Sequence, residues 1–276
     1  MARLFNAFLF KIRRDLTFRI TLIVGVALAV VMAALYGLID ALDNGTMMYL
    51  TGQTMLINSV SPVQNFGLAI PINLISFTCL EFTQGTIRNK IIAGNSKFKI
   101  YMSLLLSGLV FTFVLLFVYL GLCTLLGTIF GGFDIVNKPV VLLSGIGSGL
   151  MFATGPYILQ TLLISILIYA MVTALAIFIA TAFRVIGPTI PIVVITLMAG
   201  YFASVIIFAG YRDNTGLMNT MRFINPLFGL IDVTADSSGH LGYSGITLIG
   251  SVVCNLGYAA IFTVAGCLLF MKRDVK

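Results

Sequence analysis

Residues 157–182 read YILQTLLISILIYAMVTALAIFIATA, a run of 26 residues without a single charged side chain. A helix needs about 20 predominantly apolar residues to cross the hydrocarbon core of a bilayer. Continuous apolarity without alternation excludes the strands of a membrane β-barrel. Five further uncharged runs, of 19 to 31 residues, lie at 20–39, 62–80, 100–130, 188–210 and 246–271. The sequence therefore predicts an all-α integral membrane protein with six transmembrane helices.

The composition agrees with this fold class along the whole chain. Of the 276 residues, 59% are hydrophobic and only 9% are charged, whereas soluble domains carry about 25% charged residues. No stretch is polar enough for a soluble domain, so we expect 1–276 to form a single transmembrane domain. The cysteines lie in apolar runs without a C-x-x-C pair, which is typical of small buried hydrophobic residues; they are Cys79, Cys123, Cys254 and Cys267.

The basic residues select one orientation. If the N-terminus is cytoplasmic, all Lys and Arg residues except Lys138, Arg212 and Arg222 fall on the inner side. The positive-inside rule then predicts that both termini are cytoplasmic. A seventh crossing at 140–155 is too short and too rich in glycine, and it would place the basic C-terminal tail outside. We expect that segment to be re-entrant or to lie on the outer surface.

Three connecting segments carry a helical pattern. In 1–18, apolar residues recur at helical spacing between basic residues, which predicts an amphipathic interface helix or, alternatively, a basic flank that only fixes topology. In 81–99, Thr83 is a candidate N-cap and Gly94-Asn95 a stop signal, so we expect a cytoplasmic helix of about three turns. In 211–245, Asn225-Pro226 should end the first of one or two short helices that dip into the outer interface, giving a re-entrant outer segment before the last span.

No motif for enzymatic chemistry is present. The chain lacks the G-x-x-x-x-G-K-[ST] phosphate loop, and Gly94-Asn95-Ser96-Lys97 is only a distant match. His240 is the single histidine, and its Ser/Gly-rich surroundings are typical of a solvated loop. The six spans contain no acidic residue for a proton relay. We therefore expect neither a catalytic residue, nor a metal site, nor a cofactor in this chain.

Small and polar residues form stripes along several spans. Such stripes serve close helix packing or line a pathway, and an Asn in hydrocarbon needs a partner or water. The G-x-x-x-G match at Gly127 and Gly131 is a weak packing signal, since it falls at a span end. The candidates for a substrate path are Asn65, Asn73 and Ser76 in the second span, and Thr196 and Ser204 in the fifth.

The stretch Glu81-Phe82-Thr83-Gln84-Gly85-Thr86-Ile87-Arg88 resembles the segment between the second and third spans of type-2 ATP-binding-cassette exporter permeases. There the pattern is Glu, an aromatic residue, two variable residues, Gly-Thr, an aliphatic residue and a basic residue. The layout is similar too, with an amphipathic helix before the first span and a re-entrant outer segment before the last. The resemblance implies a coupling helix whose partner-binding residues are Glu81, Phe82, Gln84, Gly85, Thr86, Ile87 and Arg88.

The same resemblance implies partners and a function. The partners would be a cytoplasmic ATP-binding subunit carrying ATP and Mg, a second permease chain in a homodimer or heterodimer, and membrane lipid, with no nucleic acid. The chain would be the permease of a bacterial cell-membrane exporter for a hydrophobic or amphipathic substrate, such as a peptide, a lipid-like compound or a drug. Two alternatives stay open: a channel or ion-coupled carrier, and a peptide-sensing immunity protein without transport.

Overall fold

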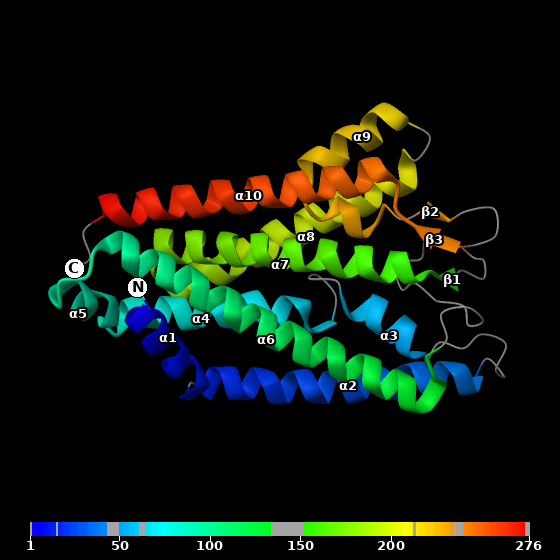
Figure 1. Ribbon diagram of the computed structural model, residues 1–276, viewed down its shortest axis with the longest axis horizontal. Helices are drawn as coiled ribbons and strands as arrows, with labels where there is room; N and C mark the ends of the chain where they lie inside the picture. Colours follow the sequence, from blue (N-terminus) through cyan, green and yellow to red (C-terminus); the bar gives the residue numbers. More distant parts are fainter. Residues whose placement is uncertain are drawn as a thin grey trace.

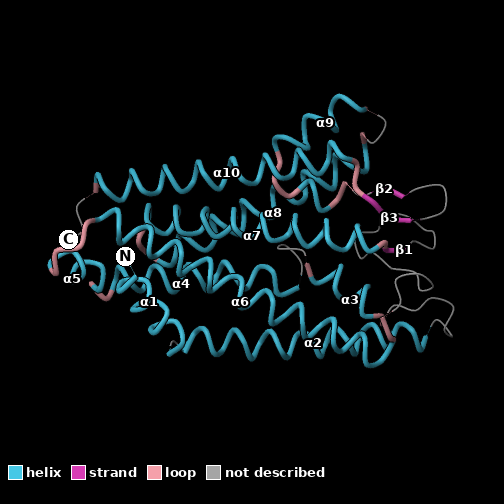
Figure 2. Tube along the Cα trace, viewed as in Figure 1, coloured by secondary structure: helices cyan, strands magenta, loops and turns pink. Residues whose placement is uncertain are grey.

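The computed structural model of the chain describes residues 2–14, 16–42, 50–60, 65–133, 152–211, 214–232, 234–235 and 240–273. Nearly all of this part is helical, and the long helices run along the longest axis of the molecule (Figures 1 and 2). The helices are α1 (Ala2–Arg14), α2 (Leu16–Leu42), α3 (Gly52–Ser59), α4 (Ala69–Thr83), α5 (Thr86–Ile92), α6 (Lys97–Gly131), α7 (Gly155–Phe183), α8 (Ile186–Gly210), α9 (Thr215–Ile224) and α10 (Gly245–Lys272), with 3₁₀ turns η1 (Asn65–Leu68) and η2 (Phe228–Leu230).

Five of these helices are long and apolar enough to cross a bilayer: α2, α6, α7, α8 and α10. They have 25 to 35 residues, more than the roughly 20 that a crossing requires. By helix composition the chain is a multi-pass membrane protein. These helices confirm five of the predicted spans, at 20–39, 100–130, 157–182, 188–210 and 246–271. The most deeply buried is α7, which packs against α4, α6, α8 and α10.

The predicted span at 62–80 does not form one long helix. Its regular part, α4, has 15 residues and follows the 3₁₀ turn η1, while residues 61–64 lie outside the described part of the chain. Pro71 stands in the first turn of α4, where its missing N–H costs no helical hydrogen bond. The structure therefore shows a shorter apolar helix, and the sixth crossing of the expected length is not confirmed.

An unpredicted short helix, α3, packs against the C-terminal half of α6. Gly131 and Gly127 permit this contact: a Cβ added to Gly131 would overlap the carbonyl oxygen of Leu50, and one added to Gly127 would lie 2.7 Å from that of Thr51. The Gly52 N–H also donates to the carbonyl of Gly132 (3.1 Å). The G-x-x-x-G pair that looked weak in the sequence thus marks a close helix approach.

Several helices begin at polar caps that the sequence supplies, and α6, α7, α9 and α10 are among them. The side-chain oxygens of Ser96, Thr154, Asn214 and Ser244 each accept a hydrogen bond from the backbone N–H three residues further along. Such caps satisfy donors that the first helical turn leaves without partners. The starts of α6, α7, α9 and α10 are therefore fixed locally.

The two ends of the helix bundle differ. Both termini, α1 and α5 lie at one end, whereas α3, α9 and three short strands lie at the other (Figure 1). The strands β1 (Phe152–Ala153), β2 (Thr234–Ala235) and β3 (His240–Gly242) form a small sheet in the order β1-β3-β2. His240, expected in a loop, thus lies in a strand. Most of the segment 140–155, expected to be re-entrant or to lie on the outer surface, is outside the described residues.

Candidate coupling site and membrane path

The turn between α4 and α5 has a defined geometry. Gly85 adopts φ 66°, a left-handed conformation that favours glycine, and it precedes the first residue of α5. Its N–H donates to the carbonyl of Phe82 (3.1 Å), and its own carbonyl accepts from the N–H of Asn89 (3.0 Å). The prediction that Thr83 is the N-cap is wrong, because α4 continues through Thr83 and its hydroxyl donates back to the carbonyl of Leu80 (3.3 Å).

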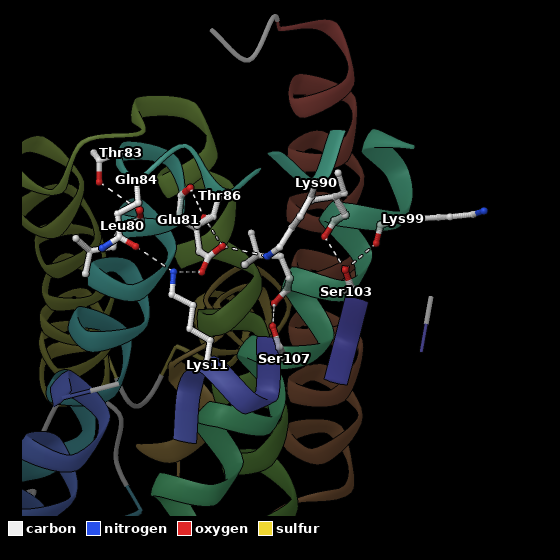
Figure 3. A network of polar contacts seen from close by, with 12 residues as sticks. Lys11, Leu80, Glu81, Thr83, Gln84, Thr86, Lys90, Lys99, Ser103 and Ser107 are labelled. Atoms are coloured by element: carbon white, nitrogen blue, oxygen red, sulfur yellow. Dashed lines mark hydrogen bonds and ion pairs between the residues drawn. The ribbon is translucent and has the colours of Figure 1, made fainter. Parts of the chain in front are cut away.

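Glu81 is the centre of a polar network beneath this turn (Figure 3). Its carboxylate is fully buried, with Lys11 Nζ 2.6 Å from Oε1 and Lys90 Nζ 3.1 Å from Oε2. The Thr86 hydroxyl lies 2.7 Å from the same Oε2, and Lys11 also donates to Gln84 Oε1 (3.1 Å). The network therefore joins three helices, α1 through Lys11, α4 through Glu81 and α5 through Thr86 and Lys90.

The ionisation of Glu81 reflects two opposed effects. Burial alone would raise the pKa of this carboxyl, but the hydrogen bonds from Lys11 and Thr86 and the charges of both lysines outweigh it and hold the pKa below its usual value. Glu81 is thus an anion at neutral pH. For Lys90, burial prevails over the attraction of Glu81 and lowers the pKa of the ammonium group. The site therefore contains a charged carboxylate that is shielded from water by the surrounding side chains.

The predicted partner-binding residues divide into two groups. Glu81 and Ile87 are fully buried within the chain, so they hold the turn rather than face a partner. Gln84 and Arg88 are exposed, and Gly85 and Thr86 are partly exposed. The half-buried ring of Phe82 meets Phe270 edge-on at 6.1 Å and lies under the Arg184 guanidinium at 5.6 Å. Only the exposed group can contact another protein.

Helix α1 is amphipathic as predicted, but much of its apolar face packs on the bundle. Phe8 and Ile12 are buried, whereas Phe10 is 59% exposed. Lys90 Nζ lies 3.2 Å from the centroid of the Phe8 ring, a cation–π contact that adds to the ion pair. The sequence reasoning missed Lys11 and Lys90 as partners of Glu81. The available signal was a lone carboxylate at the end of an apolar run, since such a charge needs a cation when buried.

The stop signal of α5 is confirmed, but the helix is shorter than predicted. It ends at Ile92, two residues before Gly94, whose φ of 83° is left-handed. The Asn95 side chain donates to the carbonyl of Lys90 (3.0 Å), which satisfies a group that the helix end leaves open. With seven residues, α5 has about two turns instead of three.

The predicted path residues whose side chains the structure describes make hydrogen bonds within the chain. Asn73 and Ser76 on α4 donate to carbonyls of their own helix, at 2.7 and 3.0 Å. On α8, Thr196 does the same at 2.7 Å, and the buried Ser204 accepts from the Asn225 amide at 2.8 Å. The side chain of Asn65 lies outside the described part of the chain. The proposed path along α4 and α8 stays a prediction.

The segment 214–232 forms a tightly held element at the other end. α9 ends at Ile224, as Asn225-Pro226 predicted. Arg222 Nε donates to Asp232 at 2.6 Å, and the Thr247 hydroxyl donates to the same buried carboxylate at 2.7 Å. Asn225 reaches the carbonyl of Gly200 in the middle of α8 (2.8 Å). The turn after α9 therefore enters between helices instead of lying on top of them.

A cavity of about 310 Å³ lies where this element meets the long helices. Its walls come from α7, α8, α10 and the end of α9 with the following turn, and Thr196 is the only predicted path residue among them. The twelve lining residues are Met171, Leu175, Thr196, Leu197, Gly200, Met221, Ile224, Asn225, Pro226, Leu227, Tyr258 and Phe262.

Comparison of the chain with protein-family models, with curated proteins and with solved structures finds no match. The geometry and the motif at 81–88 are therefore the observations that bear on function.

Proposed function

We propose that the chain is the permease subunit of an ATP-driven exporter and that α5 is the helix on which a separate ATPase acts. The observation that carries this proposal is the division of the α4–α5 turn. Its inner side is fixed by the buried Glu81 network, while Arg88 and Gln84 face outward at one end of the bundle. A helix that is rigidly joined to the bundle yet presents a cation to solvent is suited to receive force from a partner.

The membrane arrangement supports the same proposal. α1, α5 and both termini share one end of the bundle (Figure 1), and positive charge predicts that this end is cytoplasmic. The turn at 225–227 enters between α8 and α10 from the opposite end, as a re-entrant outer segment would. Substrate would leave on that side, carried outward by two such chains that move against each other. The long helices offer no charged side chain in their middle, which favours an apolar or amphipathic substrate.

Site-specific photo-crosslinking tests the proposal in cells. A photoreactive residue is placed at Ile92 on α5, which is 72% exposed. The matched control position is Ile129, which is 65% exposed and lies near the C-terminal end of α6. We expect Ile92, and not Ile129, to crosslink to a protein with a Walker-type nucleotide site, identified by mass spectrometry. If no nucleotide-binding protein is captured, or if both positions capture it equally, the proposal is wrong.

The Arg88→Gln variant extends this test to the contact itself. Because Arg88 is exposed, its loss should leave the stability of the isolated chain unchanged while reducing capture of the ATPase from Ile92 at least tenfold. Capture at the wild-type level would remove Arg88 from the interface.

A further inference from the structure

The cavity between α7, α8, α10 and the turn after α9 shares no lining residue with the Glu81 network. About 310 Å³ of space is at the lower end of the range found for pockets that hold small ligands. Most of its walls are hydrophobic side chains, including two methionines, Met171 and Met221. Methionine side chains are flexible and adapt to ligands of variable shape.

The side-chain polar groups of Asn225 and Thr196 in the walls already make hydrogen bonds within the chain. The Asn225 amide donates to the Gly200 carbonyl and to Ser204 Oγ, both at 2.8 Å, and accepts from the Leu227 N–H at 3.1 Å. The Thr196 hydroxyl donates to the carbonyl of Ile192 (2.7 Å). Among the described residues, no charged side chain lines the cavity. A charged or strongly polar ligand would therefore lose its hydration without compensation.

The cavity lies about halfway through the bundle. Thr196 and Gly200 are ten and fourteen residues after the start of α8, and Phe262 and Tyr258 are ten and fourteen residues before the end of α10. At about 1.5 Å per residue, both pairs lie about 15–21 Å from the end that carries the termini. The hydrocarbon core of a bilayer is about 30 Å thick, so the cavity is at the depth of the lipid tails.

The cavity also reaches the surface of the chain. Two of its lining residues, Thr196 and Ile224, are exposed, the latter by 55%. Their neighbours in the sequence, Ile195 and Phe223, are apolar and exposed as well, by 65% and 46%. An opening surrounded by exposed apolar side chains at this depth faces lipid tails rather than water. An apolar cavity does not retain water well, so hydrocarbon is the occupant that the surroundings supply.

We propose that this cavity binds a single hydrocarbon chain of a membrane lipid, which enters sideways from the bilayer through the opening between Thr196 and Ile224. The lipid headgroup remains outside, because none of the described lining residues carries a charge that could pair with it. The site does not depend on the exporter proposal, since it uses none of the residues of the α4–α5 turn. One wall is the turn at 225–227, so a bound chain contacts the outer element directly.

Photolabelling by lipid tests this site. The full chain is placed in phosphatidylcholine nanodiscs that contain a trace of phosphatidylcholine with a diazirine in the middle of one acyl chain. The labelled positions are mapped by mass spectrometry. The label ratio is the amount of label on the peptide that contains Met221 and Leu227, divided by the amount on the exposed face of α2. We expect this ratio to exceed one, because a bound chain resides longer than the lipid around α2.

A blocking experiment separates the cavity from the neighbouring surface. Thr196→Cys is modified after folding with a benzyl methanethiosulfonate, which fills the opening, and Ile195→Cys is the matched control outside it. The four native cysteines are buried, so modification is directed to the new thiol. We expect the label ratio to fall at least fivefold with Thr196→Cys and to stay within twofold with Ile195→Cys. An equal change in both variants, or a wild-type ratio of one or less, would overturn the proposal.

Discussion

Replacing Glu81 by Gln keeps the shape of the side chain and removes the anion that joins α1, α4 and α5. Lys90 and Lys11 then lose their counterion, and their side chains are only 19% and 36% exposed. Breaking a fully buried ion pair costs about 3–5 kcal/mol. Because both lysines keep part of their hydration and the amide still accepts a hydrogen bond, we expect about 2 kcal/mol. For a chain of this size, about 2–4 °C is lost per kcal/mol, so the melting temperature should fall by about 4–8 °C.

The measurement uses the cysteines, since the chain has no tryptophan. All four are buried, so a fluorogenic maleimide reacts with them only as the fold opens on heating. The matched control is Arg88→Gln, which removes an exposed charge from the same turn and should change stability by no more than about 0.5 kcal/mol. If the melting temperature of Glu81→Gln equals that of the wild type, or if the melting temperature of Arg88→Gln falls by the same amount, then the network does not hold the turn.

Three further predictions concern other parts of the fold. Because the pKa of Glu81 is lowered in the folded chain, its carboxylate takes up a proton in the unfolded chain at a higher pH than in the folded chain. The difference in melting temperature between the wild type and Glu81→Gln should therefore shrink below about pH 4. Gly131→Ala should destabilise the fold by more than about 2 kcal/mol, because the new Cβ overlaps Leu50. Gly121→Ala is the control, since the space around Gly121 is open, and it should be neutral or stabilising by up to about 1 kcal/mol. The melting temperatures of the two variants test this difference. Asp232→Asn, which weakens the hold on α9, should cost about 3 kcal/mol and should increase the labelling of cysteines introduced on α9 by a membrane-impermeant reagent.

Five of the six predicted spans could be recognised because the length of an uncharged run is a strong constraint on a membrane helix. The run at 62–80 met the same criterion, but hydropathy does not distinguish an α-helix from a 3₁₀ turn followed by a shorter helix that contains Pro71. The buried helix α3 was missed for a different reason. Its polar side chains, such as Thr54 bonded to Thr51 at 2.7 Å, look like those of a loop until α6 covers them.

At the candidate site, the motif located the turn and its buried Glu81, but not the two lysines that pair with this carboxylate. The exposed position of Arg88 follows from local helix geometry. The contact of Glu81 with Lys11 does not, because it requires α1 to fold back over α6, a long-range arrangement that the spacing of residues in α1 cannot specify. Similarly, Ser204 was identified as a polar residue in a span, but its partner Asn225 comes from an element 21 residues away that enters from the other end.

The Glu81 network and the cavity are connected through α4. Glu81 belongs to α4, so a displacement of α5 is passed to α4 without an intervening flexible link. α4 packs against α7 and α8, which supply two walls of the cavity. The other two walls are joined to each other, since Asn255 on α10 donates to the carbonyl of Pro226 (3.2 Å), and Arg222 near the end of α9 is paired with Asp232. Under the proposed function, a push on α5 is therefore passed through α4 to the two walls that α7 and α8 supply, and this movement changes the space available to a hydrocarbon chain. Glu81→Gln should loosen this link while leaving the lipid label in the cavity at rest unchanged.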